Sequence, residues 1–158
     1  MQITEKTIES VLDQLYDSDE TKAAAIMEEM SKEQPVILSY IMQMSEEFEH
    51  PDERETLIFL AVLVWKSFKT AFGNLASVSE EAMKNAEDRL FKKMEDMEKS
   101  GNMTMHVQTE VQPVLMGCIA EEVFANKPEN LNAVEYKTVA VHLTSLQVVT
   151  DALQATLT

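Results

Sequence analysis

The chain has 158 residues, with 28 acidic and 13 basic side chains and a formal net charge of −15. This length suits one domain with a substantial core, and the charge disfavours direct binding to nucleic-acid phosphates or to anionic membranes. The single cysteine, Cys118, excludes an intramolecular disulfide and a zinc site with several cysteines. The three glycines and four prolines are few for a loop-rich protein, whereas eleven methionines are many and suit a helical interior. We therefore expect one all-α domain over residues 1–158.

Hydropathy gives no sign of a membrane or export segment. The first ten residues lack the basic start and apolar core of a signal peptide, so we expect a cytoplasmic protein. The longest apolar run, Leu57–Trp65, is well short of the about 20 residues that a membrane-spanning helix needs. This run instead predicts a helix that is surrounded by others.

Three helices are predicted before residue 50. The first covers about residues 5–16, with Thr4 as its N-cap and with Ile3 and Ile8 in the positions of a hydrophobic staple. A second follows the turn at 17–19. A third is expected to begin at Pro35, because proline suits the first helical position, and to reach about Phe48.

Two further helices are marked by capping-box spacings. Asp52 and Glu55 have this spacing before the fourth helix, which is expected to end near residue 72 and to form the centre of the core. Ser77 and Glu80 have it before the fifth, whose apolar residues recur at helical intervals as far as Met97.

The last two predicted helices are less regular. A sixth is expected over about 104–125 and contains Pro113, so it is either kinked there or divided in two. Residues 139–149 alternate like a strand, but the apolar positions from Val139 to Leu157 fit a helical face, and we interpret 133–157 as a helix. Because this segment has few charges, it is either enclosed within the chain or covered by a second subunit. Self-association as a homodimer through 133–157 is the resulting partner prediction.

An internal sequence repeat suggests a duplicated architecture of about seven helices. Gln34-Pro35 and the apolar residues after this pair correspond to Gln112-Pro113 and the apolar residues that follow it. The match continues through Pro51 and Pro128, and it places Trp65 opposite His142. The pattern predicts pseudo-repeat units 1–78 and 79–158 that stack into one continuous core, as in helical repeat proteins. Chance similarity between apolar helices is the alternative.

The densest polar segment, residues 46–55, has one feature of a metal site. Glu47 and His50 show the Glu-x-x-His spacing of di-iron carboxylate bundles. Those sites need two such motifs, and neither His106 nor His142 has a glutamate three residues before it. A solvated helix end is the favoured interpretation, and no metal site is predicted.

A second carboxylate pattern points to enzymatic chemistry. The pair Glu28-Glu29, together with Glu49 and Asp52, resembles the paired acidic motifs of the MazG-type all-α nucleotide pyrophosphohydrolases, although Lys32 stands where that motif has glutamate. The resemblance implies that these four carboxylates hold Mg²⁺ against a nucleoside triphosphate. A magnesium-dependent hydrolase is therefore the alternative function.

Motifs for nucleophilic catalysis and for phosphate binding are missing from the sequence. It contains no Gly-x-Ser-x-Gly, no phosphate-binding glycine loop and no Cys-x-x-Cys, and Cys118 lies among apolar residues, as expected of a buried thiol. We predict no catalytic residue and no cofactor. The favoured function is a non-enzymatic helical protein-interaction or scaffold module that binds neither nucleic acid nor membrane.

Overall fold

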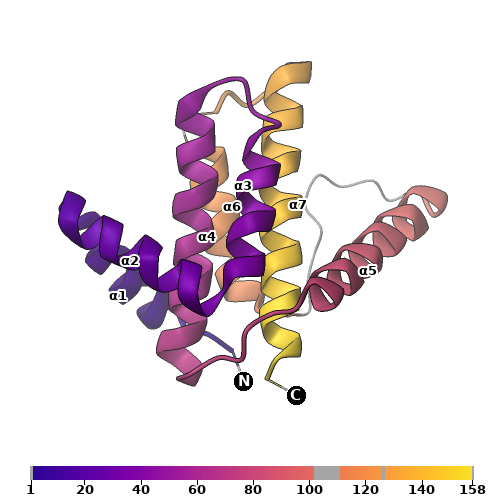
Figure 1. The fold of residues 1–158 in the computed structure, drawn as a ribbon. Helices are drawn as coiled ribbons and strands as arrows, with labels where there is room; N and C mark the ends of the chain where they lie inside the picture. The colour runs from indigo at the N-terminus through magenta and orange to yellow at the C-terminus, as the bar shows by residue number, and fades with distance from the viewer. Residues whose placement is uncertain (1, 102–110, 126, 158) are drawn as a thin grey trace.

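The computed structural model describes residues 2–101, 111–125 and 127–157 (Figure 1). The seven helices within these ranges are α1 Glu5–Tyr16, α2 Glu20–Glu33, α3 Pro35–Ser45, α4 Pro51–Phe72, α5 Glu80–Lys99, α6 Pro113–Phe124 and α7 Ala133–Ala155. The all-α prediction is confirmed. None of these helices is long and apolar enough to cross a membrane.

The helix starts near the N-terminus follow from short polar side chains. Thr4 accepts a hydrogen bond from the Thr7 backbone N–H at 3.2 Å, and Asp19 accepts one from the Lys22 backbone N–H at 2.8 Å. Each bond satisfies a backbone donor that has no partner inside the helix. Ile3 and Ile8 are both buried, as expected of a hydrophobic staple.

Both capping boxes predicted from the sequence are wrong. Ser79, not Ser77, caps α5 and accepts from the Ala82 backbone N–H at 3.1 Å, because Val78 must occupy the buried position just before the cap. At α4 the N-cap is His50, which makes no side-chain cap bond, so Asp52 lies in the first turn. The capping box that the described chain does form is at α7, between Asn132 and Glu135.

Two helix boundaries differ from the prediction, and one choice between helix and strand is settled. Helix α3 ends at Ser45, three residues early, in a tight turn that continues to Phe48. Helix α6 begins at Pro113, and the expected part over 104–110 lies outside the described residues. The strand alternative for 139–149 is wrong, because α7 is one unbroken helix. Its Val and Thr side chains are buried on most faces, so tertiary packing outweighs their preference for strands.

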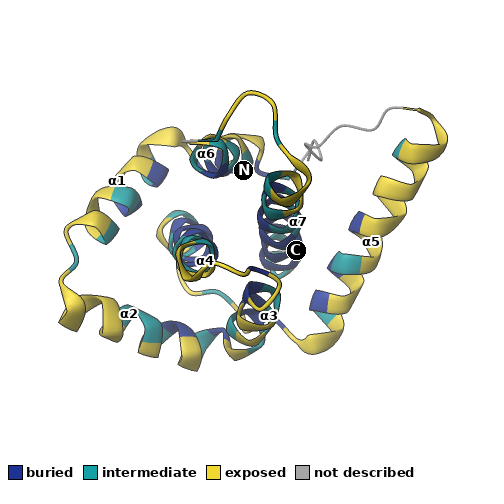
Figure 2. Ribbon diagram, turned by 90° about the horizontal axis from the view of Figure 1, so that it is seen from above, coloured by how far each residue is buried: buried dark blue, intermediate teal, exposed yellow. Residues whose placement is uncertain are grey.

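The core is built around α4 and α7, which pack against each other. Seen along their axes, α4 is encircled by α1, α2, α3, α6 and α7, whereas α5 lies outside, against α7 (Figure 2). The prediction that α4 is central is confirmed by its buried side chains, among them Trp65 and Phe68, both fully buried. The second half of α7 is equally enclosed, from Ser145 to Thr150.

The two Gln-Pro pairs have matching roles. Gln34 and Gln112 are both buried, and each precedes the proline that starts α3 or α6. The side-chain oxygen of Gln34 accepts from the Val78 backbone N–H at 2.9 Å, just before α5. That of Gln112 accepts from the Ile3 backbone N–H at 2.7 Å, just before α1. Each glutamine therefore fixes the start of a helix that lies in the other half of the chain.

The helix packing follows the same twofold pattern. Helix α1 packs on α4 as α5 packs on α7, and α3 packs on α4 as α6 packs on α7. Between the halves, α1 on α6 and α3 on α5 are paired contacts, whereas α3 on α7 has no equally extensive counterpart. Helix α2 belongs to the first half alone among the described helices. This arrangement supports the proposal that units 1–78 and 79–158 arose by duplication.

Candidate functional site

A hollow of the described surface lies beside α4, between the α1–α2 corner and the loop that leads into α7. It has two adjoining parts that share Glu55 and Phe59 in their walls. The larger part, a cavity of about 730 Å³, is called here the acidic pocket and is lined by Asp52, Glu53, Glu55, Glu122, Lys127 and His142. The smaller part, about 220 Å³, is called the apolar groove and is lined by Leu15, Ala23, Ile26, Met27, Ile58 and Val62.

A chain of three side chains forms the inner wall of the acidic pocket. Glu53 on α4 receives a hydrogen bond from Lys127 Nζ at 2.7 Å and binds His142 Nε2 at 2.9 Å through its other oxygen. An ionised carboxylate only accepts, so His142 Nε2–H is the donor. These contacts link α4 to α7 and to Lys127 in the segment before α7.

The protonation states follow from burial and these bonds. Burial acts to raise the pKa of Glu53, but the hydrogen bonds from Lys127 and His142 outweigh it and leave this pKa below its ordinary value. Burial lowers the pKa of His142 by more than the bond to Glu53 raises it. His142 is therefore neutral near pH 7. Its ring stacks on Phe48 at 4.5 Å between centroids, and its Nδ1 has no hydrogen-bond partner among the described residues.

Two stacked aromatic rings lie in the wall of the hollow. Tyr16, at the end of α1, stacks on Phe59 of α4 with 5.5 Å between ring centroids. Tyr16 remains 63 % exposed. Partial burial and the nearby charge of Glu122 raise the pKa of the Tyr16 hydroxyl. The junction thus offers exposed aromatic surface next to a carboxylate.

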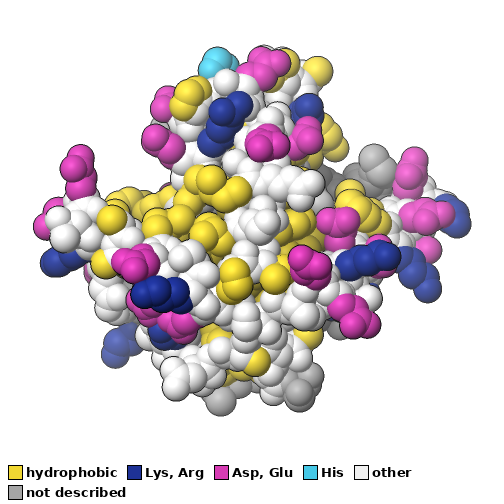
Figure 3. Space-filling model, viewed as in Figure 1, with side chains coloured by type: hydrophobic (Ala, Val, Ile, Leu, Met, Phe, Trp, Pro, Cys, Tyr) yellow, Lys and Arg dark blue, Asp and Glu magenta, His cyan; other side chains and the backbone are white. Residues whose placement is uncertain are grey.

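The apolar groove exists because α2 stands away from α4. Ile26 and Met27 on α2 and Ile58 on α4 are only partly buried, although all three adjoin the core. Figure 3 shows hydrophobic side chains gathered above α2 and across α4 and α3, with acidic side chains around them. Such a band can accept apolar side chains of another molecule.

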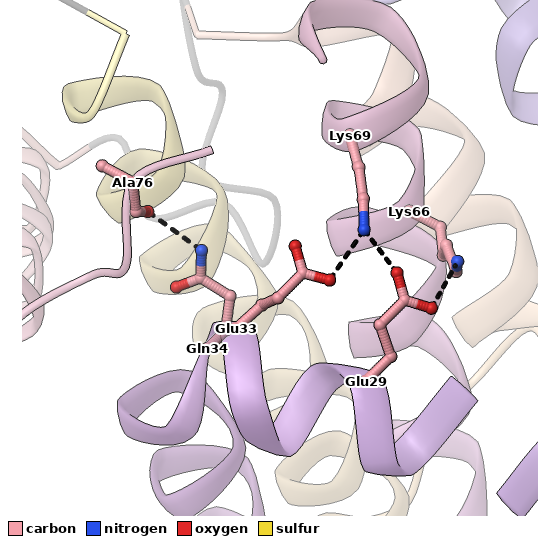
Figure 4. A network of polar contacts seen from close by, with 6 residues as sticks. All are labelled: Glu29, Glu33, Gln34, Lys66, Lys69 and Ala76. Atoms are coloured by element: carbon pink, nitrogen blue, oxygen red, sulfur yellow. Dashed lines mark hydrogen bonds and ion pairs between the residues drawn. The ribbon is translucent and has the colours of Figure 1, made fainter. Parts of the chain in front are cut away.

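The structure does not bring together the four carboxylates that resemble the MazG-type site. Glu29 binds Lys69 and Lys66 on α4, while Glu33 binds Lys69 at 2.7 Å (Figure 4). Glu28 pairs with Lys32 at 3.2 Å on the exposed face of α2. These pairs tie α2 to α4 and leave the carboxylates engaged with lysines.

Distance along α4 separates the second pair of those carboxylates from the first. Asp52 lies in the first turn of α4, whereas Lys66 and Lys69 lie about 21 and about 26 Å further along it at the helical rise of about 1.5 Å per residue. Glu49 is in the turn before α4. Among the described residues, no group of three or more His, Cys, Asp or Glu side chains is placed to share a metal ion. The geometry lacks the convergence that the magnesium hypothesis requires.

The acidic segment 46–55 forms a solvated helix junction. Glu47 lies 3.8 Å from Lys137, with both side chains more than half exposed, and His50 is an exposed N-cap. Glu53 alone in this segment faces inward to a histidine. The Glu-x-x-His spacing in the sequence relates Glu47 to His50. The buried histidine that this segment contacts is instead His142, which binds Glu53.

Helix α7 explains the shortage of charge in 133–157. From Val139 to Leu153 it is covered by α3, α4, α5 and α6 of the same chain. Only Val134 and Tyr136, near its start, are exposed large apolar residues. Enclosure within the chain accounts for the pattern, and a second subunit is not needed to explain it.

Sequence reasoning missed the acidic pocket. The signal was the repeat itself, which placed polar His142 where the first half has Trp65, on an otherwise apolar helix. A buried histidine requires a polar partner, and Glu53 provides it from the other half of the chain. The fold and the hollow define an all-α helical array with a cleft between its N-terminal helices and its central pair. No family model, curated protein or solved structure matches this chain.

Proposed function

We propose that the protein is a non-enzymatic helical interaction module that binds an amphipathic, basic helix of a partner protein in the cleft beside α4. The observation that carries the proposal is the apolar groove, which continues into a pocket rimmed by carboxylates. A helix that presents apolar residues on one face and basic residues at its edge has the matching pattern.

The apolar part supplies the contact area for such a partner. Side chains from α1, α2 and α4 converge on the groove, and its volume suits a few apolar side chains spaced by one helical turn. Burial of apolar surface gives about 25 cal/mol per Å², so filling the groove favours association. Methionine and isoleucine in the walls allow the groove to adapt to different side chains.

Charge favours a basic partner over an acidic one. The whole chain carries a net charge of −15, which accelerates the approach of a positively charged segment. Asp52, Glu55 and Glu122 then lie close to where the bound helix would run. The same field repels nucleic acid and anionic lipid.

A labelled synthetic helix of leucine and lysine is the first probe, with binding followed by fluorescence anisotropy. Ala23 on α2 is exposed and lines the groove, while its neighbour Ala24 is exposed and lies outside it. Ala23→Arg fills the groove, and Ala24→Arg adds the same charge and bulk beside it. We expect Ala23→Arg to weaken binding at least about tenfold, or about 1.4 kcal/mol, and Ala24→Arg to retain it.

The paired variants also separate a groove from a charged surface. Equal losses in both variants indicate unspecific attraction between a basic peptide and an acidic protein, and they contradict the proposal. No binding to the wild-type protein does so as well. In cell extract, a partner of the groove is captured by the wild type and by Ala24→Arg but not by Ala23→Arg.

A further inference from the structure

We infer that the acidic pocket is a subsite for the guanidinium or ammonium group of an arginine or lysine on the bound helix. This inference rests on the proposed function, because it assigns the pocket to a side chain of the same partner. It adds a specific polar contact to a groove that is otherwise apolar, and it fixes the direction in which the helix lies.

The pocket contains carboxylates without counterions. Asp52, Glu55 and Glu122 line it, and none of the three has an ion pair with another residue of the described chain. Lys127, the cation of the same wall, is already bound to Glu53. The unmatched charge in the pocket is therefore negative, and it favours a positively charged ligand.

Two features besides charge suit an organic cation. The exposed ring of Tyr16 stands at the pocket edge against Phe59, and aromatic faces attract guanidinium and ammonium groups. His142 also lines the pocket and is 1 % exposed, with an Nδ1 that has no partner in the described part of the chain. When the ring is neutral and Nε2 donates to Glu53, Nδ1 is an acceptor without a partner, in a residue that lines the pocket.

The size and spread of these groups favour an organic cation over a metal ion. A magnesium or calcium ion needs several oxygens within about 2.0–2.6 Å, and the described carboxylates do not gather so closely here. A cavity of about 730 Å³ instead admits a long side chain with its planar or tetrahedral head. Arginine and lysine have that length.

The shared wall links this subsite to the groove. Glu55 and Phe59 lie one turn apart on α4 and belong to both parts of the hollow. A bound helix whose apolar residues enter the groove can therefore extend one basic side chain past Phe59 into the pocket. The partner motif is an apolar face followed, about one or two turns along, by arginine or lysine.

The test compares a charged side chain with its neutral isostere. Probe peptides are amphipathic helices with a single arginine, scanned along the edge of the apolar face, and each has a twin with citrulline at that position. For the best register we expect citrulline to weaken binding to the wild-type protein roughly five- to tenfold. With Glu55→Gln/Glu122→Gln the twins should bind equally well, whereas Glu81→Gln, an exposed change on α5, should preserve the difference.

The outcomes distinguish the subsite from the proposed function. If the peptides bind in the groove, as judged by Ala23→Arg, but arginine and citrulline bind alike in every register, the subsite is wrong and the groove stands. If no peptide binds, the proposed function fails. An NMR titration with butylguanidinium then examines the pocket alone. Shifts confined to Tyr16 and His142 would assign it to a free organic cation, and their absence would overturn a cation site altogether.

Discussion

The side-chain oxygen of Gln112 accepts a 2.7 Å hydrogen bond from the backbone N–H of Ile3, across 109 positions of sequence. Gln34 makes the equivalent bond to Val78. In both cases the donor lies immediately before a helix N-cap, and its apolar side chain is buried. The halves of the chain thus hold each other's first helices through one amide each. This reciprocity is the strongest structural support for an internal duplication.

Removing either amide should destabilise the fold. Gln34→Ala leaves the backbone N–H of Val78 and the carbonyl of Ala76 without their partner, and an unsatisfied buried group costs about 1–3 kcal/mol. We expect Gln34→Ala and Gln112→Ala each to lower the free energy of unfolding in urea by this amount. Gln43→Ala, an exposed glutamine on α3, is the control and should change it by less than about 0.5 kcal/mol. Equal losses at all three positions would contradict the role given to the buried amides.

The N-cap of α5 gives a direct test of helix register. Ser79 caps the helix in the structure, whereas the sequence pattern pointed to Ser77, two residues earlier. Ser79→Ala should cost about 1 kcal/mol in unfolding free energy, and Ser77→Ala, at an exposed position before the cap, should cost little. The reverse order would support the capping box read from the sequence and would shift the start of α5.

Most of the fold could be predicted because its signals are local. Thr4, Asp19 and Pro35 mark helix starts by their own chemistry, and the apolar run from Leu57 to Trp65 marks the central helix. The predicted capping box at α5 failed because a cap also depends on the burial of the residue next to it. Ser77 and Ser79 are indistinguishable as capping residues until Val78 is known to be buried.

The site was harder to predict because its parts come from distant segments. Glu53, Glu122 and His142 lie on three different helices and Lys127 lies before α7, so no local spacing relates them. Glu28, Glu29, Glu49 and Asp52 formed a pattern in sequence, yet their distances depend on the direction of α2 along α4. Periodicity shows which face of a helix is apolar, but not which part of that face a neighbour leaves uncovered.

The ion pairs of Lys69 on α4 with Glu29 and Glu33 on α2 should show energetic coupling between the partners. Lys69 binds Glu29 and Glu33 with its side chain 25 % exposed, whereas Lys32 and Glu28 form a fully local pair with both side chains about 70 % exposed. A double-mutant cycle of Glu29→Gln and Lys69→Met should give a coupling near 1 kcal/mol, compared with about 0.3–0.5 kcal/mol for Glu28→Gln and Lys32→Met. Urea unfolding of each set provides the values. Similar coupling in both cycles would show that the bridge adds nothing beyond an exposed ion pair.

The buried histidine should make stability depend on pH. Burial holds the pKa of His142 below its ordinary value of 6.5, so the unfolded chain binds this proton at a higher pH than the folded chain does. The contribution to stability is complete above pH 6.5 and is lost as the pH falls toward the folded pKa. Glu53, whose pKa is also lowered, adds a second loss at more acidic pH, below its ordinary value of 4.5. The free energy of unfolding in urea should therefore change little from this source above pH 6.5 and decline as the pH falls from 6.5 to about 5. His142→Gln keeps a donor for Glu53 but does not titrate, so its decline over this range should be shallower than that of the wild type.

His50→Gln, at the exposed N-cap of α4, is the matched control and should follow the wild type. A decline that His142→Gln leaves unchanged would remove His142 as its source.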